Sequence, residues 1–148
     1  MDTAKYEMWG ATRLARENGD ARVLVVDDDP GGRGAIAAYL ALEGMEARGV
    51  ASCDEALRVS SEWEPDIAVL DIMMPVHDGF QTARALRAKF DEKILIVAFT
   101  ATDSVFVKSH SDSCWLFDGY CQKGSPPMHL VRVLESLLAS KQRRQSPA

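Results

Sequence analysis

Acidic side chains follow two apolar segments of this sequence at the point where each segment ends. Asp27 and Asp28 come directly after Val23–Val26, and Asp71 follows Ile67–Leu70. Both segments are apolar without alternation, which is typical of strands buried on both faces of a parallel sheet. Ligands bind beyond the carboxyl ends of such strands. We therefore interpret these carboxylates as parts of one site.

Three carboxylates at one edge of a sheet need a compensating positive charge. Two unit charges about 4 Å apart repel by about 4 kcal/mol at an effective dielectric near 20. Oxygen ligands with open positions suit Mg²⁺, which keeps several waters and shares its shell with phosphate. Thr100 and Lys123 end two later apolar segments. They supply the hydroxyl and ammonium donors that a phosphoryl group on Asp71 would need.

The elements that position these groups alternate along the chain. We predict strands at 22–26, 45–50, 67–70, 93–100 and 119–122, and helices at 31–43, 54–64, 79–90, 103–114 and from Pro126 onward. Parallel crossovers are right-handed and about a helix long. The pattern therefore predicts an α/β fold, a doubly wound parallel sheet of five strands with five helices on its two faces.

Length and charge limit the organisation and the partners. The 148 residues, 47% of them hydrophobic, suit one core. We expect an N-terminal extension at 1–20, which is either partly helical at 11–18 or disordered, a domain at 21–140, and a flexible basic tail at 141–148. The net charge of -5 argues against nucleic-acid binding by this chain, since a phosphate backbone calls for a basic face.

Cysteine usage and hydropathy indicate the compartment. Cys53, Cys114 and Cys121 are odd in number and lack paired metal-ligand spacing, which favours reduced thiols. The sequence has no secretory signal pattern and no apolar run of about 18 residues. We therefore expect a cytoplasmic protein without membrane insertion. Because the chain starts at Met1 and carries no effector after its basic tail, we also expect a stand-alone protein.

Four motifs in this order resemble one family. They are V-V-D-D at 25–28, D-I-M-M-P-x-x-D-G at 71–79, A-x-T-A at 98–101 and Y-x-x-K at 120–123. Over about residues 21–140 the chain resembles a response-regulator receiver domain of two-component signalling. The resemblance implies a flavodoxin-like sheet with strand order 2-1-3-4-5, and Mg²⁺ as the cofactor.

The resemblance also implies a role for each matching residue at the metal. Asp71 would be the phospho-acceptor and a metal ligand. Asp28 would bind Mg²⁺ directly with Asp27 in support, and Met73 would contribute its backbone carbonyl.

A second set of matching residues would respond to the phosphoryl group. Lys123 would contact it, and Thr100 and Tyr120 would form the switch pair, Tyr120 filling the space that Thr100 vacates. Met73 and Thr102 occupy the positions that help to place the hydrolytic water in receivers. Neither side chain suits that task, so we expect slow autodephosphorylation.

The implied function is a phosphorylation-dependent switch and not an enzyme acting on an external substrate. The phosphoryl group would come from a histidine kinase or a histidine phosphotransfer protein. We expect residues 103–140, which flank the switch, to contact an unknown downstream protein or to form a homodimer. Two departures from the family affect the loops: Gly124 follows Lys123 where receivers usually have proline, and Gly31-Gly32 weaken the first helical turn.

Two other interpretations use the same residues. A haloacid-dehalogenase-like phosphohydrolase would use Asp27 and Asp29 as its D-x-D pair. That family places a second acidic pair after the lysine, whereas Glu135 is the only acid beyond Lys123. A degenerate receiver acting only as a docking module is the other alternative, although every group needed for phosphorylation is present.

Overall fold

Continuous apolar segments form the central strands of a six-stranded sheet. The computed structural model describes residues 6–8, 20–74, 76–110 and 116–145. The strands are β1 (Tyr6–Met8), β2 (Arg22–Val26), β3 (Glu46–Val50), β4 (Ile67–Leu70), β5 (Leu95–Thr100) and β6 (Gly119–Gln122). The helices are α1 (Pro30–Leu42), α2 (Cys53–Glu62), α3 (Gly79–Phe90), α4 (Ser104–Ser109) and α5 (Pro127–Gln145), with a 3-10 turn at Asp91–Lys93.

The order of the parallel strands agrees with the prediction. The sheet runs β1-β6-β5-β4-β2-β3, and all pairs from β3 to β6 are parallel. The five parallel strands lie in the order β3-β2-β4-β5-β6. When they are numbered from 1 to 5 along the chain, starting at β2, this is the predicted order 2-1-3-4-5. In the register of neighbouring strands, Val26 pairs with Leu70 and Leu70 with Ala98. The residues that follow these three strands therefore emerge at one edge of the sheet.

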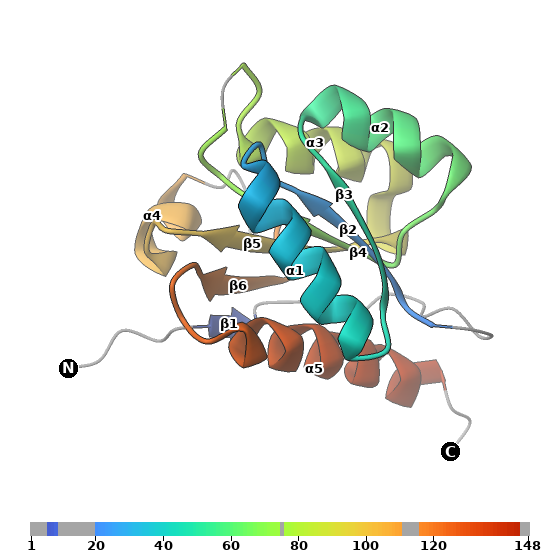
Figure 1. Cartoon of the computed structure of the whole chain (residues 1–148). Helices are drawn as coiled ribbons and strands as arrows, with labels where there is room; N and C mark the ends of the chain where they lie inside the picture. The colour runs from blue at the N-terminus through green and yellow to red at the C-terminus, as the bar shows by residue number, and fades with distance from the viewer. Residues whose placement is uncertain (1–5, 9–19, 75, 111–115, 146–148) are drawn as a thin grey trace.

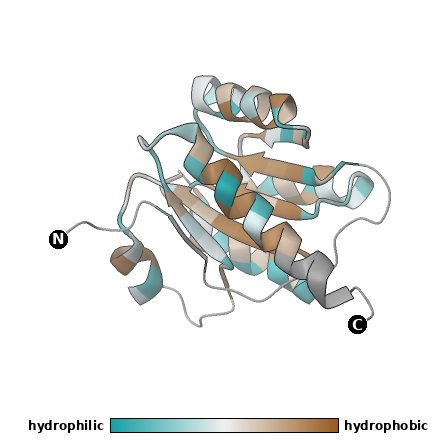
Figure 2. Ribbon diagram, turned by 90° about the horizontal axis from the view of Figure 1, so that it is seen from below, coloured by the Kyte–Doolittle hydropathy of each residue, from teal (hydrophilic) through white to brown (hydrophobic). Residues whose placement is uncertain are grey.

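Helices cover both faces of the sheet, as predicted. Figure 1 shows α1 and α5 on one face and α2 and α3 on the other. One core cluster joins the sheet to α2 and α3, with Trp63 and Phe80 among its buried residues, and a second joins the sheet to α1 and α5. The central strands stand out as the most hydrophobic layer in Figure 2. The helix layers on the two faces of the sheet thus fix the position of the strands that carry the acidic residues.

Polar caps fix the loops where helices begin. The side chain of Asp29 accepts from Gly32 N at the start of α1, so the doubled glycine does not prevent a capped first turn. Ser52 caps α2, one of the two predicted caps. Asp78 and Gln81 form a reciprocal capping box at α3. These caps stiffen the segments that follow β2, β3 and β4.

Three segments differ from the sequence-based expectation. Residues 6–8 form a strand, β1, that pairs antiparallel with β6, whereas we expected no strand in the extension at 1–20. The alternatives of helix or disorder concerned residues 11–18, which lie outside the described ranges. Helix α4 spans Ser104–Ser109 of the expected 103–114, and 111–115 are not described. Helix α5 continues to Gln145, five residues into the expected tail.

The cysteines that the structure describes are free thiols. Cys53 and Cys121 are both buried, and burial raises the pKa of Cys121 to about 11. A thiol with so high a pKa is unreactive near neutral pH. This agrees with the expectation of reduced cysteines at these two positions, and Cys114 lies outside the described residues.

A buried ion pair joins α3 to the segment before β6. Arg87 Nη2 lies 2.7 Å from Asp118 Oδ2, and both side chains are almost fully buried. Arg87 Nη1 also donates to the carbonyl of Ile94 at 2.6 Å, and Asp118 accepts from Ile96 N at 2.9 Å. This pair was not predicted from the sequence. It ties the face that carries α3 to the two strands β5 and β6.

Candidate functional site

Three carboxylates meet at the carboxyl edge of the sheet. Asp27 and Asp28 follow β2, Asp71 follows β4, and one carboxylate oxygen of each lies within 4.8 Å of the others. Asp27 and Asp71 are buried, with 4% and 7% of their surface exposed, while Asp28 is exposed. The structure therefore brings together the acidic residues that the sequence pattern singled out. An all-oxygen donor set with one solvent-facing member suits Mg²⁺, which retains water ligands.

Lys123 bridges two of these carboxylates. Its Nζ lies 2.7 Å from Asp27 Oδ2 and 3.1 Å from Asp71 Oδ2. Burial opposes the charged form of Lys123, but the hydrogen bonds to both carboxylates outweigh it and raise its pKa. Burial raises the pKa of Asp71, and the bond from Lys123 offsets part of that rise. Lys123 therefore compensates only part of the negative charge of the three carboxylates. A bound cation can compensate the rest.

The loop after β4 holds Asp71 through its backbone. Met73 N donates to Asp71 Oδ1 at 3.2 Å, and Gly79 N donates to the carbonyl of Ile72 at 2.9 Å. A Cβ on Gly79 would lie 2.4 Å from the carbonyl oxygen of Asp71, so only glycine fits this close approach. The Met73 residue, which follows Asp71 in this loop, is 63% exposed. The loop is therefore closed tightly at its base and open to solvent at its tip.

Thr100 and Tyr120 are linked by hydrogen bonds to the same residue, Thr102. The Thr100 and Tyr120 side chains are fully buried. Thr100 Oγ1 lies 3.0 Å from Thr102 Oγ1, and the Tyr120 hydroxyl donates to the Thr102 carbonyl at 2.5 Å. Thr102 is thus the common partner of the two residues that the family resemblance assigns to the switch.

The chain turns after Lys123 at Gly124, the position where the family resemblance led us to expect proline. Lys123 N donates to the Thr100 carbonyl at 2.9 Å, which extends the β5–β6 pairing to the lysine. Gly124 has φ +91, a left-handed conformation that glycine adopts without strain. Every peptide bond in the described ranges is trans. Glycine therefore provides this turn by its backbone freedom.

One contact at the site was not anticipated from the sequence. Arg33, in the first turns of α1, donates from Nη1 to the backbone carbonyl of Asp27 at 2.9 Å. The bond anchors the segment between β2 and α1 on which Asp27 and Asp28 lie. A charged residue on a surface helix gives no sequence signal for this role, because such residues usually face solvent.

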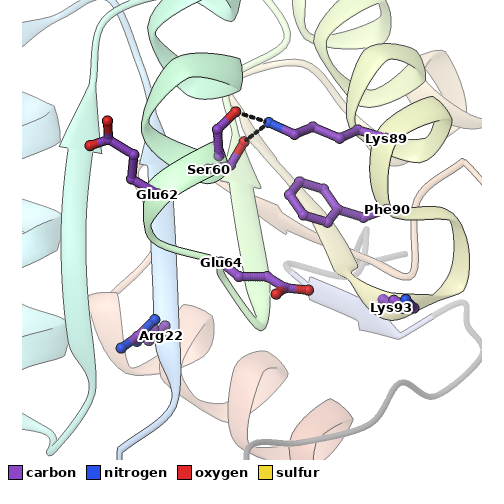
Figure 3. Close-up of a pocket in the computed structure, with 8 residues that line it drawn as sticks. Arg22, Ser60, Glu62, Glu64, Lys89, Phe90 and Lys93 are labelled. Carbon is purple, nitrogen blue, oxygen red and sulfur yellow. Dashed lines mark hydrogen bonds between the residues drawn. The ribbon is translucent and has the colours of Figure 1, made fainter.

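A separate polar pocket lies at the opposite end of the strands. It has a volume of about 570 Å³ and is lined by side chains from α2, α3 and the start of β2. Figure 3 shows Lys89 reaching from α3 to the last turn of α2, where its Nζ bonds Ser60 and Ser61. Lys89 Nζ also donates to the Leu57 carbonyl at 2.8 Å. These bonds join the two helices, and the pocket contains none of the predicted site residues.

The sequence matches the family described as the response regulator receiver domain over residues 23–134. MtrA of Mycolicibacterium smegmatis, a DNA-binding response regulator, is 36% identical over 118 residues, which cover 79% of this chain and 50% of MtrA. PrrA of Mycobacterium tuberculosis, a transcriptional regulatory protein, is 43% identical over 57% of this chain and 36% of its own length. The chain thus spans half or less of these curated relatives.

Solved structures of the same class cover nearly the whole domain. The chemotaxis protein CheY4 of Vibrio cholerae has a TM-score of 0.75 at 28% identity, covering 81% of this chain and all of CheY4. The response regulator TrrA of Thermotoga maritima, solved with Mg²⁺-BeF, has a TM-score of 0.69 at 32% identity, covering 80% of this chain and 99% of TrrA. No helix within the described ranges is long and apolar enough to cross a membrane. The chain belongs to the response regulator receiver domain family.

Proposed function

We propose that this receiver domain accepts a phosphoryl group on the carboxylate of Asp71 from a phosphohistidine donor. The observation that carries the proposal is the position of Lys123 Nζ, within 3.1 Å of both Asp27 and Asp71. An ammonium group there faces the charge that develops on the transferred phosphoryl group. The bond between phosphorus and the donor's histidine nitrogen would break as the bond between phosphorus and an Asp71 carboxylate oxygen forms. The chemistry is confined to the domain's own carboxylate.

We assign the metal to the acidic cluster. Asp28 and Asp71 would hold Mg²⁺ directly, Asp27 would support it, and the backbone carbonyl of Met73 would complete the protein ligands. Bound Mg²⁺ neutralises the negative charge of the phosphoryl oxygens during transfer. The grouping of three carboxylates within 4.8 Å supports this assignment. Lys123, which contacts Asp27 and Asp71, would donate to the phosphoryl oxygens.

The conformational response would run through Thr100. Its hydroxyl would turn from Thr102 toward the new phosphoryl oxygens, and the buried position of Tyr120 would be favoured. A ligand shifts such an equilibrium only by its differential contact energy with the two states. The Thr102 contacts of both residues support this route.

Receiver domains exchange signals with histidine kinases and downstream effectors, and we infer the same two kinds of partner here. MtrA is named as DNA-binding, and this chain covers half of it. Our expectation that this domain itself does not bind nucleic acid stays a prediction. Residues 103–140 remain our candidate for the effector or homodimer surface. Because β1 occupies the free edge of β6, such a contact would use α4 and α5.

The direct test is phosphorylation by acetyl phosphate and Mg²⁺, followed by intact mass. We expect one phosphoryl adduct on the wild type and none on Asp71→Ala. Asp54→Ala, which removes an exposed carboxylate on α2, is the control and should be modified like the wild type. A full adduct on Asp71→Ala would overturn the assignment of the acceptor.

A second experiment separates the metal ligand from its neighbour. Asp28→Asn should abolish Mg²⁺ binding measured by calorimetry, because it removes the charged ligand. Asp29→Asn is the matched control, since asparagine caps a helix as well as aspartate does. Equal Mg²⁺ affinity in both variants would contradict the proposed coordination.

A further inference from the structure

Arg33 on α1 holds the residues on both sides of Asp28. Its guanidinium Nη1 donates to the carbonyl of Asp27 at 2.9 Å, and its backbone N donates to the carbonyl of Asp29 at 2.9 Å. Asp28 lies between these two carbonyls and is exposed. The Asp27 carbonyl belongs to the planar peptide that joins Asp27 to Asp28. The orientation of this peptide therefore helps to set the direction in which the Asp28 side chain leaves the backbone.

Glycine at position 49 leaves room for the Arg33 side chain. A Cβ on Gly49 would lie 2.6 Å from Arg33 Cγ and 3.0 Å from Arg33 Cδ, and the first separation is too short for two carbon atoms. Both atoms belong to the middle of the arginine side chain, so a movement of its end alone would not relieve the contact. Gly49 lies on β3, which Figure 1 shows beside α1. The path of Arg33 from α1 to the Asp27 carbonyl thus depends on the lack of a side chain at position 49.

A cation near the acidic cluster has two opposite effects on metal binding. By charge alone, the Arg33 guanidinium repels Mg²⁺ and weakens its binding. By holding the backbone on both sides of Asp28, it reduces the ordering that this ligand needs when the metal binds, which strengthens binding. Residues that orient metal ligands from outside the coordination shell commonly change metal affinity by about 10- to 100-fold. The direction of the change on removal of Arg33 therefore distinguishes the two effects.

We propose that Arg33 is a positioning residue for the metal site, and that Gly49 makes its position possible. The proposal rests on the proposed function, in which Asp28 is a direct Mg²⁺ ligand. Arg33 is not itself a ligand, since a guanidinium carries hydrogen-bond donors only. It acts through the backbone of residues 27–29, whose two carbonyls it holds.

The test measures Mg²⁺ affinity by calorimetry in the wild-type chain, Arg33→Ala, Gly49→Ala and the double variant. Alanine at position 33 has no Cγ, so it removes both the guanidinium and the atoms that a Cβ at position 49 would meet. Arg58→Ala, which removes an exposed cation from α2, is the control for the loss of one positive charge. Hydrogen exchange of the Asp29 amide, which donates to Asp27 Oδ1 at 2.9 Å, is a second readout that needs no metal.

We expect Arg33→Ala to weaken Mg²⁺ binding by about tenfold, the lower end of the usual effect of residues that orient ligands. Gly49→Ala should weaken binding when Arg33 is present and should have no effect in the Arg33→Ala background, because the crowded atoms are then gone. Both single variants should speed exchange of the Asp29 amide. Arg58→Ala should match the wild type in both measurements.

An Arg33→Ala variant that binds Mg²⁺ as tightly as the wild type, or more tightly, would overturn the proposal, because positioning requires a loss of affinity. Equal effects of Gly49→Ala with and without Arg33 would overturn the role of Gly49. If the wild type failed to bind Mg²⁺ while both single variants still exchanged the Asp29 amide faster, the proposed metal site would fail and the positioning of residues 27–29 by Arg33 would stand.

Discussion

The ammonium group of Lys123 lies 3.1 Å from the carboxylate of Asp71, although 52 residues separate the two in sequence. Asp71 follows the central strand β4 and Lys123 follows β6, two strands away in the sheet. The intervening strand β5 ends at Thr100, whose carbonyl accepts from Lys123 N at 2.9 Å. The parallel sheet therefore positions this ion pair in the unphosphorylated protein.

Replacing Lys123 by methionine should slow phosphorylation from acetyl phosphate by about 100-fold, as removal of one oxyanion donor commonly does. The rate is followed by intact mass at saturating Mg²⁺. Lys93→Met is the control, because Lys93 is exposed at the far end of the sheet. An unchanged rate in Lys123→Met would mean that Lys123 only pairs the carboxylates and does not stabilise the transferred group.

The metal-free protein should respond to pH through Asp71. Burial raises the folded-state pKa of this carboxyl above its usual value of 3.8. A raised pKa means that the protonated carboxyl favours folding. Its contribution is complete below pH 3.8 and is lost as pH rises through the higher folded-state pKa.

Asp71→Asn lacks this titration. In EDTA, the variant should therefore be more stable than the wild type near pH 7, and the difference should shrink as the pH falls toward 4. Urea unfolding at several pH values measures the difference. A stability difference that is constant between pH 4 and pH 7 would contradict the raised pKa.

The strands and most helices could be predicted because their signals are local. Unbroken apolar segments such as Ile67–Leu70 show where buried parallel strands run, and polar residues at their ends indicate the site. The convergence of Asp27, Asp71 and Lys123 followed from the parallel topology, since the carboxyl ends of parallel strands share one edge.

What could not be predicted depends on contacts between distant segments. The three residues of β1 have no periodicity of their own and form a strand through pairing with β6. Arg33 and Arg87 resemble solvent-facing helix residues in sequence, yet one anchors the carbonyl of Asp27 and the other is buried with Asp118. Sequence periodicity reports which face of a helix is apolar and does not report which charged side chain finds a buried partner.

The buried pair of Arg87 and Asp118 should matter for stability and not for phosphorylation. Arg87→Met removes the guanidinium group that pairs with the buried Asp118 carboxylate, a change that typically costs about 3 to 5 kcal/mol. Adding Asp118→Leu removes the remaining charge, so the double variant should be more stable than Arg87→Met. Urea unfolding measures the stability of Arg87→Met, of Asp118→Leu alone and of the double variant. A double variant that loses the sum of the two single costs would show that the pair is not coupled.

The lifetime of the acyl phosphate on Asp71 should be long because Met73 and Thr102, at the two positions that help to place the hydrolytic water in receivers, are poorly suited to that task. Met73 is 63% exposed beside Asp71, and its thioether is a poor hydrogen-bond acceptor. Thr102 carries a short side chain, which limits how far its hydroxyl can reach toward Asp71. General-base positioning is commonly worth about 10²- to 10⁴-fold in rate.

Met73→Asn introduces an amide that can orient water and should accelerate phosphate release from Asp71 by about tenfold, a partial gain of that effect. Release is followed by intact mass after removal of acetyl phosphate, with Mg²⁺ held constant. Met73→Leu is the control, because it keeps an apolar side chain and adds no polar atom, and it should leave the lifetime near that of the wild type. Equal lifetimes in the asparagine and leucine variants would mean that the side chain at position 73 does not set the rate.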